Sequence, residues 1–549
     1  MNRRLEWVLL GLILAVGAWL RFSQLDLLEF KSDEAVAAQL ALKFVKSGEL
    51  PLAGLMSSVG VTNPPLFIYL LIPAFFVTTS IPAVTCFIAL CGLGAVAATW
   101  WVGRRYYGPV AGLVAAAFFA VSPWAVIYSR KLWAQDFVPA FAVGTIWAVH
   151  ALCLGKKPRA IFWALFLPLC VIQIHFSGLA LTATVVAVVL VLRPKVDWKW
   201  AGAAVVAAFL LMIPYLRLQS QNDWADFRKA AATVGGQKFN FPPGMTVHPD
   251  NGYALPSRAP WVQALAIMNA GQIEDILGLS ARRELDRNSV WKERYFEETL
   301  TLGDWLPVAQ RLLFIAALVW LVSLAFRHQE TRHHWIVALW IAVPVGVFVV
   351  ARLWTYLSYF VILYPAHYLA LGIVADRLAA KFRWPVIAAV ALLVAGNVVF
   401  ANDLFAFLRS HRGAHGTYGT VLADKAAAAQ YVAGLGDVKQ LTAQARLWQV
   451  DRVVNVGQGQ TVALADRAQL DLPFLAAEYR PAGMLASNRM VVVVDQNRVN
   501  CEPPNWMQFR TAVTVPRGGQ AQLFELQWNR SLPVVQTNFG GMWIFVVQR

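Results

Sequence analysis

Charged residues and cysteine are scarce in this sequence, and each shortage excludes a class of protein. Only 14% of the 549 residues are charged, whereas 58% are hydrophobic, which excludes an ordinary soluble globular protein. The five cysteines form no CxxC pair and have no histidine at ligand spacing, so we expect neither a disulfide framework nor a metal site. The glycine-rich segment 413–419 lacks the spacing of a phosphate-binding loop. No internal repeat or low-complexity tract stands out.

Long hydrophobic runs are abundant instead. A helix needs about 20 apolar residues to span a bilayer, and several runs reach that length. Segment 64–76 is also apolar, but it is too short to cross and two prolines open it. The sequence therefore predicts a polytopic α-helical membrane protein with about eleven transmembrane helices. The predicted spans are 7–22, 82–102, 109–128, 136–154, 160–176, 178–193, 200–217, 306–326, 335–351, 357–375 and 385–401.

Basic residues predict the orientation of these helices. If segment 64–76 does not cross, the basic short loops fall on the side of Arg3 and Arg4, which the positive-inside rule places in the cytoplasm. Orientation thus explains the net charge of +16 without a nucleic-acid partner. No small-x-small site follows the first apolar run, so we predict no cleavable signal. The basic loop residues are Arg104, Arg105, Lys156, Lys157, Arg159, Arg193, Lys195, Lys199, Arg327, Arg332, Arg377, Lys381 and Arg383.

The same topology predicts two domains. The tail 402–549 is polar and mixed, with a helix-like run at 423–435 and strand-like runs at 490–494 and 543–547. We therefore predict a transmembrane module at 1–401 and a soluble α/β domain at 402–549 on the outer face of a bacterial inner or plasma membrane. The outer segments within the module are 23–80, 128–135, 173–178, 218–305 and 352–356.

Two adjacent carboxylates, Asp33 and Glu34, follow the first hydrophobic helix and precede an amphipathic run at 35–47. A carboxylate at a membrane surface can deprotonate an incoming hydroxyl or amine. The same pair can instead begin a helix, with Ser32 or Asp33 as the N-cap and both acids favoured by the helix dipole. The spacing alone leaves both readings open.

Basic residues also occur in short outer loops, where the orientation rule disfavours them. Arg130 and Lys131 lie in one such loop and Arg352 in another. An anionic ligand such as a phosphate headgroup would explain them, because it pairs with an arginine fork or a lysine charge. The alternative is interfacial snorkelling without any ligand.

Two further polar residues interrupt the outer ends of apolar runs. Asp136 opens a predicted helix directly after Arg130 and Lys131, so it is either an N-cap, an arginine partner or an acid of the site. His175 breaks an apolar stretch that is too long for one helix. It is either a hydrogen-bonded turn residue or a ligand or base.

These motifs resemble those of the GT-C glycosyltransferases that use polyprenyl-phosphate sugars. The resemblance covers residues 5–200 and continues weakly through the later helices. The most similar groups are the protein O-mannosyltransferases, of glycosyltransferase family 39, and the bacterial aminoarabinose transferases of lipid A. The residues that carry it are Leu20-Arg21, Phe30, Asp33-Glu34-Ala35, Asn63-Pro64-Pro65-Leu66, Gly103-Arg104-Arg105, Tyr128-Ser129-Arg130, Asp136, Tyr359 and Tyr364-Pro365.

The resemblance implies a GT-C-like fold with an outward-facing site in which Asp33 is the catalytic carboxylate and Glu34 its neighbour. Asn63 stands where the aminoarabinose transferases have a phosphate-binding lysine, which shifts phosphate binding toward Arg130, Lys131 or Arg352. The second acid of the family corresponds to Asp136 or to Gln135 beside it. The remaining candidates are Tyr359 at the lipid or phosphate and His175 and Arg21 at the sugar or acceptor.

The predicted reaction is inverting transfer of one sugar from a polyprenyl-phosphate donor to a lipid, glycan or protein acceptor. Arginine and lysine can stabilise a monophosphate leaving group, so the reaction needs no metal or other cofactor. One alternative is an oligosaccharide ligase or polymerase. Another is a lipid or solute transporter with an outer sensory domain, which should carry polar residues at helix midpoints.

Overall fold

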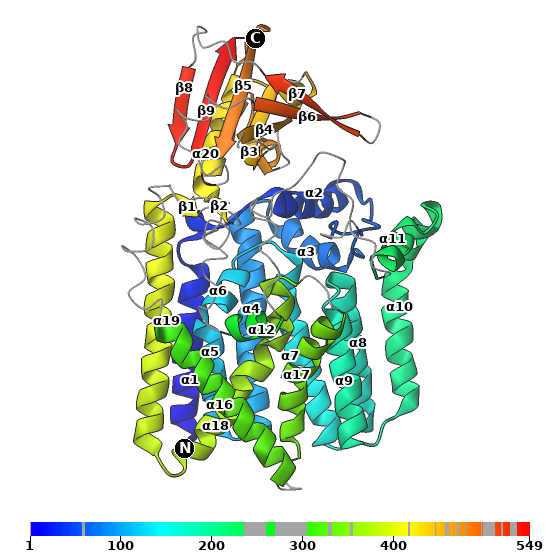
Figure 1. Cartoon of the computed structure of the whole chain (residues 1–549), viewed down its shortest axis with the longest axis vertical. Coiled ribbons are helices and arrows are strands. Elements are labelled where there is room, and N and C mark those ends of the chain that lie inside the picture. Colours follow the sequence, from blue (N-terminus) through cyan, green and yellow to red (C-terminus); the bar gives the residue numbers. More distant parts are fainter. Residues whose placement is uncertain are drawn as a thin grey trace.

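The structure is a computed structural model of the whole chain. It describes residues 2–57, 61–234, 260–268, 305–327, 332–351, 355–414, 418–444, 446–455, 461–467, 471–477, 479–481, 483–495, 497, 511–517, 520–526 and 535–548. The described part has a helical bundle at one end and a β-sheet at the other, with shorter helices between them (Figure 1).

Every predicted hydrophobic run contains an α-helix. The bundle helices are α1 (Arg3–Phe22), α4 (Ile81–Tyr106), α5 (Pro109–Val121), α6 (Pro123–Tyr128), α7 (Val138–Cys153), α8 (Ile161–Ile174), α9 (Gly178–Leu192), α10 (Trp198–Gln221), α16 (Trp305–Arg327), α17 (His334–Val350), α18 (Tyr364–Ala379) and α19 (Arg383–Ser410). The predicted helix at 109–128 is in fact two helices, because Pro123 has no amide hydrogen and begins α6 after a break at Ser122. Short 3₁₀ helices of three to seven residues adjoin the bundle. They are η1 (Leu25–Leu27), η2 (Ala134–Phe137), η3 (Pro158–Ala160) and η5 (Leu357–Leu363).

The chain is an integral membrane protein. Within the described residues, seven helical segments are long and apolar enough to cross a bilayer: Arg3–Phe22, Ile81–Tyr106, Ala134–Cys153, Trp198–Gln221, Leu306–Arg327, Leu357–Ala379 and Arg383–Ser410. The predicted count of about eleven spans stays a prediction.

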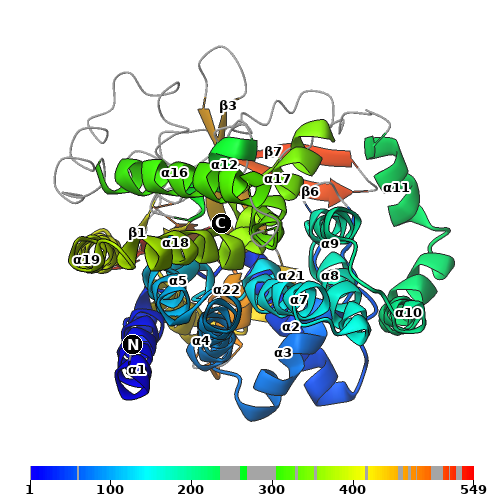
Figure 2. The same cartoon turned by 90° about the horizontal axis from the view of Figure 1, so that it is seen from below.

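The bundle has a buried centre and an apolar rim. Helices α5 and α18 pack against each other in the middle, whereas α1, α10 and α19 lie at the periphery (Figure 2). The peripheral helices expose large apolar side chains such as Phe209 and Leu392. Lipid tails can cover such a surface, because inside a bilayer apolar side chains need no protein partner.

Two short helices lie between the bundle and the sheet. Helix α2 (Ser32–Ser47) packs against α3 (Leu66–Val77). The apolar segment 64–76 thus forms the 12-residue α3, which rises about 18 Å and is shorter than the hydrocarbon layer. Helix α2 therefore lies at the end of the bundle that faces the sheet (Figure 1).

Among the described residues after α19, seven strands form a mixed sheet of order β7-β6-β4-β3-β5-β9-β8. Strand β3 pairs in parallel with β5, and β4 with β6, while the other pairs are antiparallel. The sheet strands are β3 (Leu447–Asn455), β4 (Thr461–Arg467), β5 (Arg489–Asp495), β6 (Thr511–Arg517), β7 (Gln520–Leu526), β8 (Val535–Phe539) and β9 (Met542–Gln548). Its helices are α20 (Leu422–Leu435), α21 (Val438–Ala443) and α22 (Asp471–Ala476).

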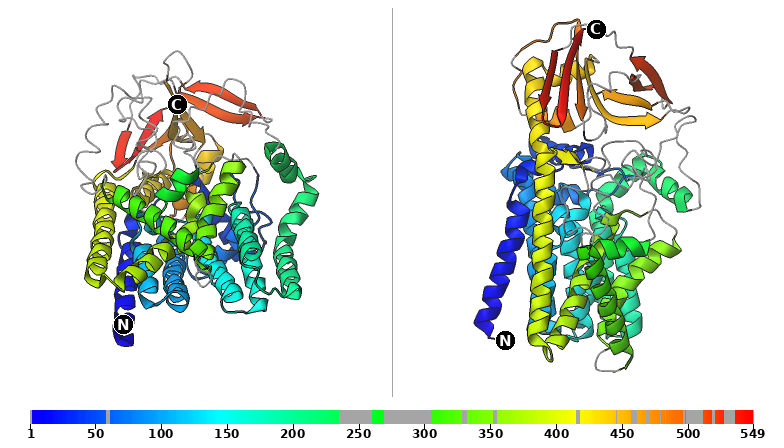
Figure 3. Two further views of the ribbon diagram at one scale, coloured as in Figure 1. Left: turned by 60° about the horizontal axis from the view of Figure 1, so that its bottom comes forward. Right: turned by 60° about the vertical axis from the view of Figure 1, so that its left-hand side comes forward.

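Helix α19 links the two layers. It runs the height of the bundle and ends beneath the sheet (Figure 3). The predicted domain boundary between residues 401 and 402 lies inside this helix, which continues to Ser410 because its apolar pattern extends through Phe407 and Leu408. A two-stranded ladder of β1 (Gly413–Ala414) and β2 (Gly419–Thr420) then leads into α20.

Candidate functional site

At the start of α2, the two adjacent carboxylates, Asp33 and Glu34, have different environments. Lys31 is the extended residue before the helix, and its backbone N–H donates to Glu34 Oε2 at 3.0 Å. Neither Ser32 nor Asp33 is the N-cap, so the carboxylate that serves the helix start belongs to Glu34. The Asp33 side chain is exposed and makes no hydrogen bond or ion pair with any described residue, whereas Glu34 is fully buried. The pair is therefore divided into one solvent-facing and one structural carboxylate.

Buried charges surround Glu34. The ammonium group of Lys131 lies 2.8 Å from Glu29 Oε1 and 3.3 Å from Glu34 Oε1, and Lys31 also pairs with Glu29. We refer to Glu29, Lys31, Glu34 and Lys131 as the acid–lysine cluster. The Lys131 ammonium group also lies 4.2 Å from the ring centroid of Trp133, a distance at which the ring face attracts a cation.

The cluster shifts the pKa values of its members in opposite directions. Burial disfavours the charge on Lys131, but Glu29 and Glu34 outweigh burial and raise the pKa of its ammonium group. Burial likewise opposes ionisation of Glu29, yet Lys131 and Lys31 lower the pKa of this carboxyl. At Glu34 burial prevails over Lys131 and raises the pKa. Glu29 is therefore the ionised partner of the lysines, and Glu34 takes up a proton more readily.

Asp136 adjoins the cluster at η2. Its carboxylate interacts electrostatically with Lys131, and Oδ2 accepts the backbone N–H of Trp133 at 3.2 Å. The other oxygen, Oδ1, has no hydrogen-bond partner among the described residues, and the same holds for Oε1 of the adjacent Gln135. The structure thus brings Glu34, Lys131 and Asp136 together.

Arg130 points in another direction, toward the end of α1. Its guanidinium carbon lies 4.6 Å from the ring centroid of Phe405 in α19. Burial lowers the pKa of this guanidinium group, which still holds its proton at neutral pH. Its Nη1 and Nη2 donate at 2.5–3.2 Å to four backbone carbonyls, those of Leu20, Arg21, Ser23 and Gln24.

Arg21 joins α1 to α5. Its Nη1 donates to the carbonyl of Gly17 at 3.0 Å and to that of Ala120 at 2.7 Å, and Nη2 donates to Phe119 at 3.4 Å. The side chain is buried, and its Nε has no hydrogen-bond partner among the described residues. The carbonyls of helix ends therefore hold both predicted arginines, Arg21 and Arg130.

Asn63 closes the loop before α3. Its backbone N–H and its Nδ2 both donate to the carbonyl of Leu55, at 2.9 and 3.0 Å. Its own carbonyl accepts the N–H of Gly54, and its Oδ1 has no hydrogen-bond partner among the described residues. Arg352, the third predicted basic residue, lies outside the described residues.

His175 and Tyr359 contact each other, with ring centroids 4.5 Å apart and an angle of 61° between the ring planes. Nδ1 of His175 accepts the backbone N–H of Ser177 at 3.1 Å, which leaves the ring proton of a neutral imidazole on Nε2. This contact joins the turn between α8 and α9 to η5. The aromatic rings of Phe348 and Tyr356 flank Tyr359.

Sequence reasoning missed Glu29 and Lys31. Their signal was present, because residues two apart on an extended segment point to the same side, and Phe30 between them is apolar. No group of three His, Cys, Asp or Glu side chains within the described residues is placed to hold a metal ion.

The bundle, the acidic helix at one end of it and the sheet beside that helix belong to an integral membrane protein, and comparison with solved structures gives its fold. No family model matches the sequence, and no curated protein matches it significantly. The structure of ArnT from Cupriavidus metallidurans bound to undecaprenyl phosphate aligns with a TM-score of 0.53 at 14% identity, over 98% of each chain. This likeness shows the fold and confirms the predicted GT-C architecture.

Two other solved structures align less closely. ArnT from Cupriavidus metallidurans in the apo state gives a TM-score of 0.46 at 14% identity, over 99% of this chain and 98% of that chain. The archaeal oligosaccharyltransferase AglB from Archaeoglobus fulgidus, with an inhibitory peptide and a dolichol-phosphate, gives 0.46 at 12% identity, over 95% of this chain and 74% of that chain.

Proposed function

We propose that this chain is an inverting glycosyltransferase, which moves one sugar from a polyprenyl-phosphate donor to an acceptor on the outer face of the membrane. The acceptor is a lipid, a glycan or a protein. The fold shared with ArnT bound to undecaprenyl phosphate supports this class of reaction. The observation on which the proposal rests is the exposed carboxylate of Asp33.

Asp33 is suited to act as a general base. It stands in the first turn of α2, whose dipole favours an anionic side chain at this end. Because Glu34 already accepts the N–H of Lys31, the helix start does not depend on Asp33. An exposed carboxylate without a structural partner can accept a proton from a substrate that reaches it from the outer side.

The proposed reaction is a single displacement. Asp33 takes the proton of the acceptor hydroxyl or amine, whose oxygen or nitrogen forms a bond to the anomeric carbon. The bond from that carbon to the phosphate oxygen breaks, and the polyprenyl phosphate leaves with the electron pair. Attack opposite the leaving group inverts the anomeric centre. This chemistry has no redox step and consumes no further co-reactant.

The leaving phosphate needs a positive partner, and Lys131 is the described residue that we assign to it. Its raised pKa keeps its charge throughout the physiological range. When Glu34 holds a proton, which its raised pKa favours, the charge of Lys131 is less fully neutralised within the cluster. We also propose that Arg352 binds the phosphate. Arg130 already donates to four carbonyls, so we assign it the support of α1 instead of a phosphate contact.

The remaining candidates have supporting roles in the proposal. Asp136 has an oxygen without a hydrogen-bond partner in the described part of the chain and is the second acid, which orients the acceptor or the sugar. Asn63 offers a neutral amide in the place of the lysine in related transferases. His175 and Tyr359 form an aromatic wall for a sugar or a lipid chain, and Arg21 supports the end of α1.

We also propose that about eleven helices span a bacterial plasma or inner membrane with the N-terminus in the cytoplasm. The sheet and its helices then form an outer α/β domain that covers α2. Helix α2 and the sheet lie at the same end of the bundle and the N-terminus at the opposite end, which supports this topology (Figure 1).

Mass spectrometry of membrane lipids and glycans tests the proposed function. Cells without the gene should accumulate one polyprenyl-phosphate sugar and lose one glycosylated product. A plasmid that encodes the wild-type chain should restore the product, whereas one that encodes Asp33→Asn should not. Identical lipid and glycan profiles with and without the gene would contradict the proposal.

A further inference from the structure

Residues of the sheet layer and its helices donate hydrogen bonds to the backbone immediately before the acidic helix α2. Three donors, one just before β2 and two in the first turn of α20, bind three carbonyls of the segment 27–30. We refer to these donors, Tyr418, Leu422 and Lys425, as the carbonyl clamp. The Tyr418 hydroxyl donates to the carbonyl of Leu27, the Leu422 N–H to that of Leu28 at 2.8 Å, and the Lys425 ammonium group to that of Phe30 at 2.8 Å.

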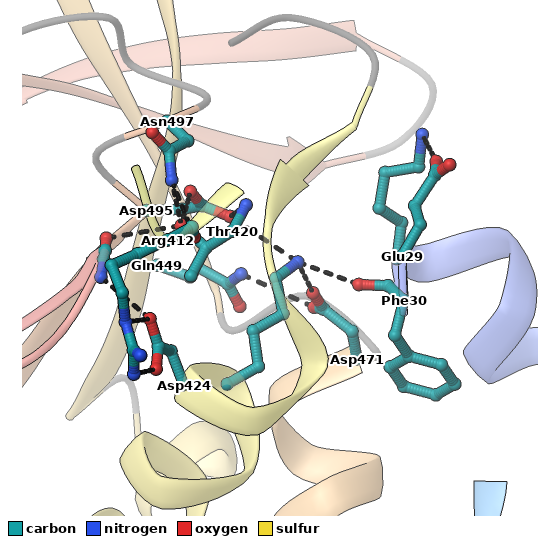
Figure 4. Close-up of polar contacts among 12 residues, drawn as sticks. Glu29, Phe30, Arg412, Thr420, Asp424, Gln449, Asp471, Asp495 and Asn497 are labelled. Atoms are coloured by element: carbon teal, nitrogen blue, oxygen red, sulfur yellow. Dashed lines mark hydrogen bonds and ion pairs between the residues drawn. The ribbon is translucent and has the colours of Figure 1, made fainter. Parts of the chain in front are cut away.

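Lys425 is unusual because its charge is buried at the junction of the two layers. Its side chain is 2% exposed, and its ammonium group lies 3.1 Å from Asp471 Oδ2 and 3.4 Å from Asp495 Oδ2. Figure 4 shows Asp471, Asp495 and the carbonyl of Phe30 around this contact. An ammonium group has three N–H donors, and these three oxygens can use them all. Lys425 therefore connects Asp471 and Asp495 of the sheet layer with the backbone before α2.

Apolar packing strengthens the same contact. Phe30 is fully buried, and its ring lies 5.7 Å from that of Phe474 in α22. Helix α2 itself packs against α22. The contact with α22 therefore includes both the segment 27–30 and α2.

The clamp acts on the backbone that carries the site. Phe30 lies between Glu29 and Lys31, which are both members of the acid–lysine cluster, and α2 begins one residue later at Ser32. A rotation of the Phe30 peptide would displace the Glu29 carboxylate from Lys131 and the Lys31 N–H from Glu34. The position of Asp33 depends on the same backbone.

We propose that Tyr418 and Lys425 are positioning residues, which hold the segment 27–31 so that the Asp33 carboxylate faces the substrates. The catalytic consequence rests on the proposed function, whereas the hold on the backbone does not. A small misplacement of a catalytic group costs up to about 100-fold in rate, so loss of the clamp should lower kcat by about 10- to 100-fold. The donor KM should change less than twofold, because neither residue touches the donor.

Hydrogen exchange and kinetics on the full-length protein in nanodiscs test the proposal. Tyr418→Phe removes one clamp hydroxyl, and Tyr431→Phe is its matched control, because Tyr431 lies on α20 and its hydroxyl meets Thr537. Lys425→Met removes the buried charge, and Lys439→Met on the exposed side of α21 is its control. The donor is the polyprenyl-phosphate sugar that accumulates in cells without the gene.

In both clamp variants, amides of residues 28–35 should exchange at least about tenfold faster than in the wild type, and kcat should fall. Both controls should match the wild type in exchange and in kcat. Lys425→Arg should restore part of kcat, because a guanidinium group can still donate to the carbonyl of Phe30. If Lys425→Met fails to fold, the milder Tyr418→Phe decides the question.

Unchanged exchange at residues 28–35 in Tyr418→Phe would overturn the proposal, and so would faster exchange with wild-type kcat. A wild-type protein that transfers no sugar would contradict the proposed function instead. In that case the exchange measurement still decides whether the clamp holds the segment before α2.

Discussion

The ammonium group of Lys131 lies 3.3 Å from the carboxylate of Glu34, which ties the first turn of α2 to the loop after α6. Both side chains are buried, and Glu29 completes the contact at 2.8 Å from Lys131. Removing one partner of a buried ion pair leaves an uncompensated charge in a medium that solvates it poorly. Substitutions in the cluster therefore test what stabilises the end of the bundle that faces the sheet.

Lys131→Met should lower the free energy of unfolding by about 3–5 kcal/mol, because Glu29 and Glu34 then lack their shared cation. Adding Glu34→Gln to this variant should recover part of the loss. Lys43→Met is the control, since Lys43 pairs with Glu49 on the surface and should contribute less than about 1 kcal/mol. Denaturant unfolding in detergent measures all four proteins. Equal stability of Lys131→Met and Lys43→Met would contradict the cluster.

Stability should depend on pH through Glu29. Because Lys131 and Lys31 lower its pKa in the folded protein, the unfolded chain binds a proton at a higher pH than the folded one. The stabilisation is present above the ordinary pKa near 4.5 and is lost as the pH falls through the lowered value. The melting temperature of the wild type should therefore fall more steeply below about pH 5 than that of Glu29→Gln. Parallel curves for the two proteins would be evidence against this contact.

Arg130→Lys should destabilise the fold and leave donor binding nearly unchanged. A lysine cannot serve four carbonyls in the plane that the guanidinium occupies, so we expect a loss of about 1–3 kcal/mol. Arg409→Lys is the control, because its contacts with Gln24 and Asp26 are exposed. A tenfold rise in donor KM without loss of stability would instead assign Arg130 to the phosphate.

Cysteine accessibility tests the topology. Labels at positions 45, 260 and 480 should react with an impermeant reagent from outside, whereas labels at 105, 157, 196 and 380 should react only after the membrane is opened. The expectation follows from the basic loops and from the common placement of α2 and the sheet. An inside location for position 45 or 480 would contradict the topology and, with it, the outward-facing site.

The sequence predicted features that depend on local patterns. Hydrophobic runs located the bundle helices, and the adjacent carboxylates at 33 and 34 marked the start of α2. The break at Ser122 was missed because the run stays apolar across it, although Pro123 signals it. The use of Arg130 on backbone carbonyls was not predictable, because every residue has a carbonyl and the sequence does not say which ones a helix end leaves unpaired.

Long-range contacts were also outside the reach of sequence reasoning. Lys131 meets Glu29 across about a hundred residues, and Lys425 meets Phe30 across nearly four hundred. No local periodicity encodes such pairs, and the fold alone brings them together. The sequence places Glu29 and Lys31 on the same side of an extended segment, but only the fold shows that Lys131 lies beside them.

The central claim is that Asp33 is the general base, and turnover by Asp33→Asn tests it most directly. Asparagine has nearly the shape of aspartate, and Asp33 is not the N-cap of α2, so an Asp33 without a catalytic role would tolerate the change. The measurement is single-sugar transfer in nanodiscs, with Asp26→Asn as the control, because Asp26 is another acid of the same outer segment. We predict a fall of about 10²- to 10⁴-fold in kcat at an unchanged melting temperature for Asp33→Asn, and near-normal turnover for the control. Wild-type turnover by a folded Asp33→Asn protein would contradict the account.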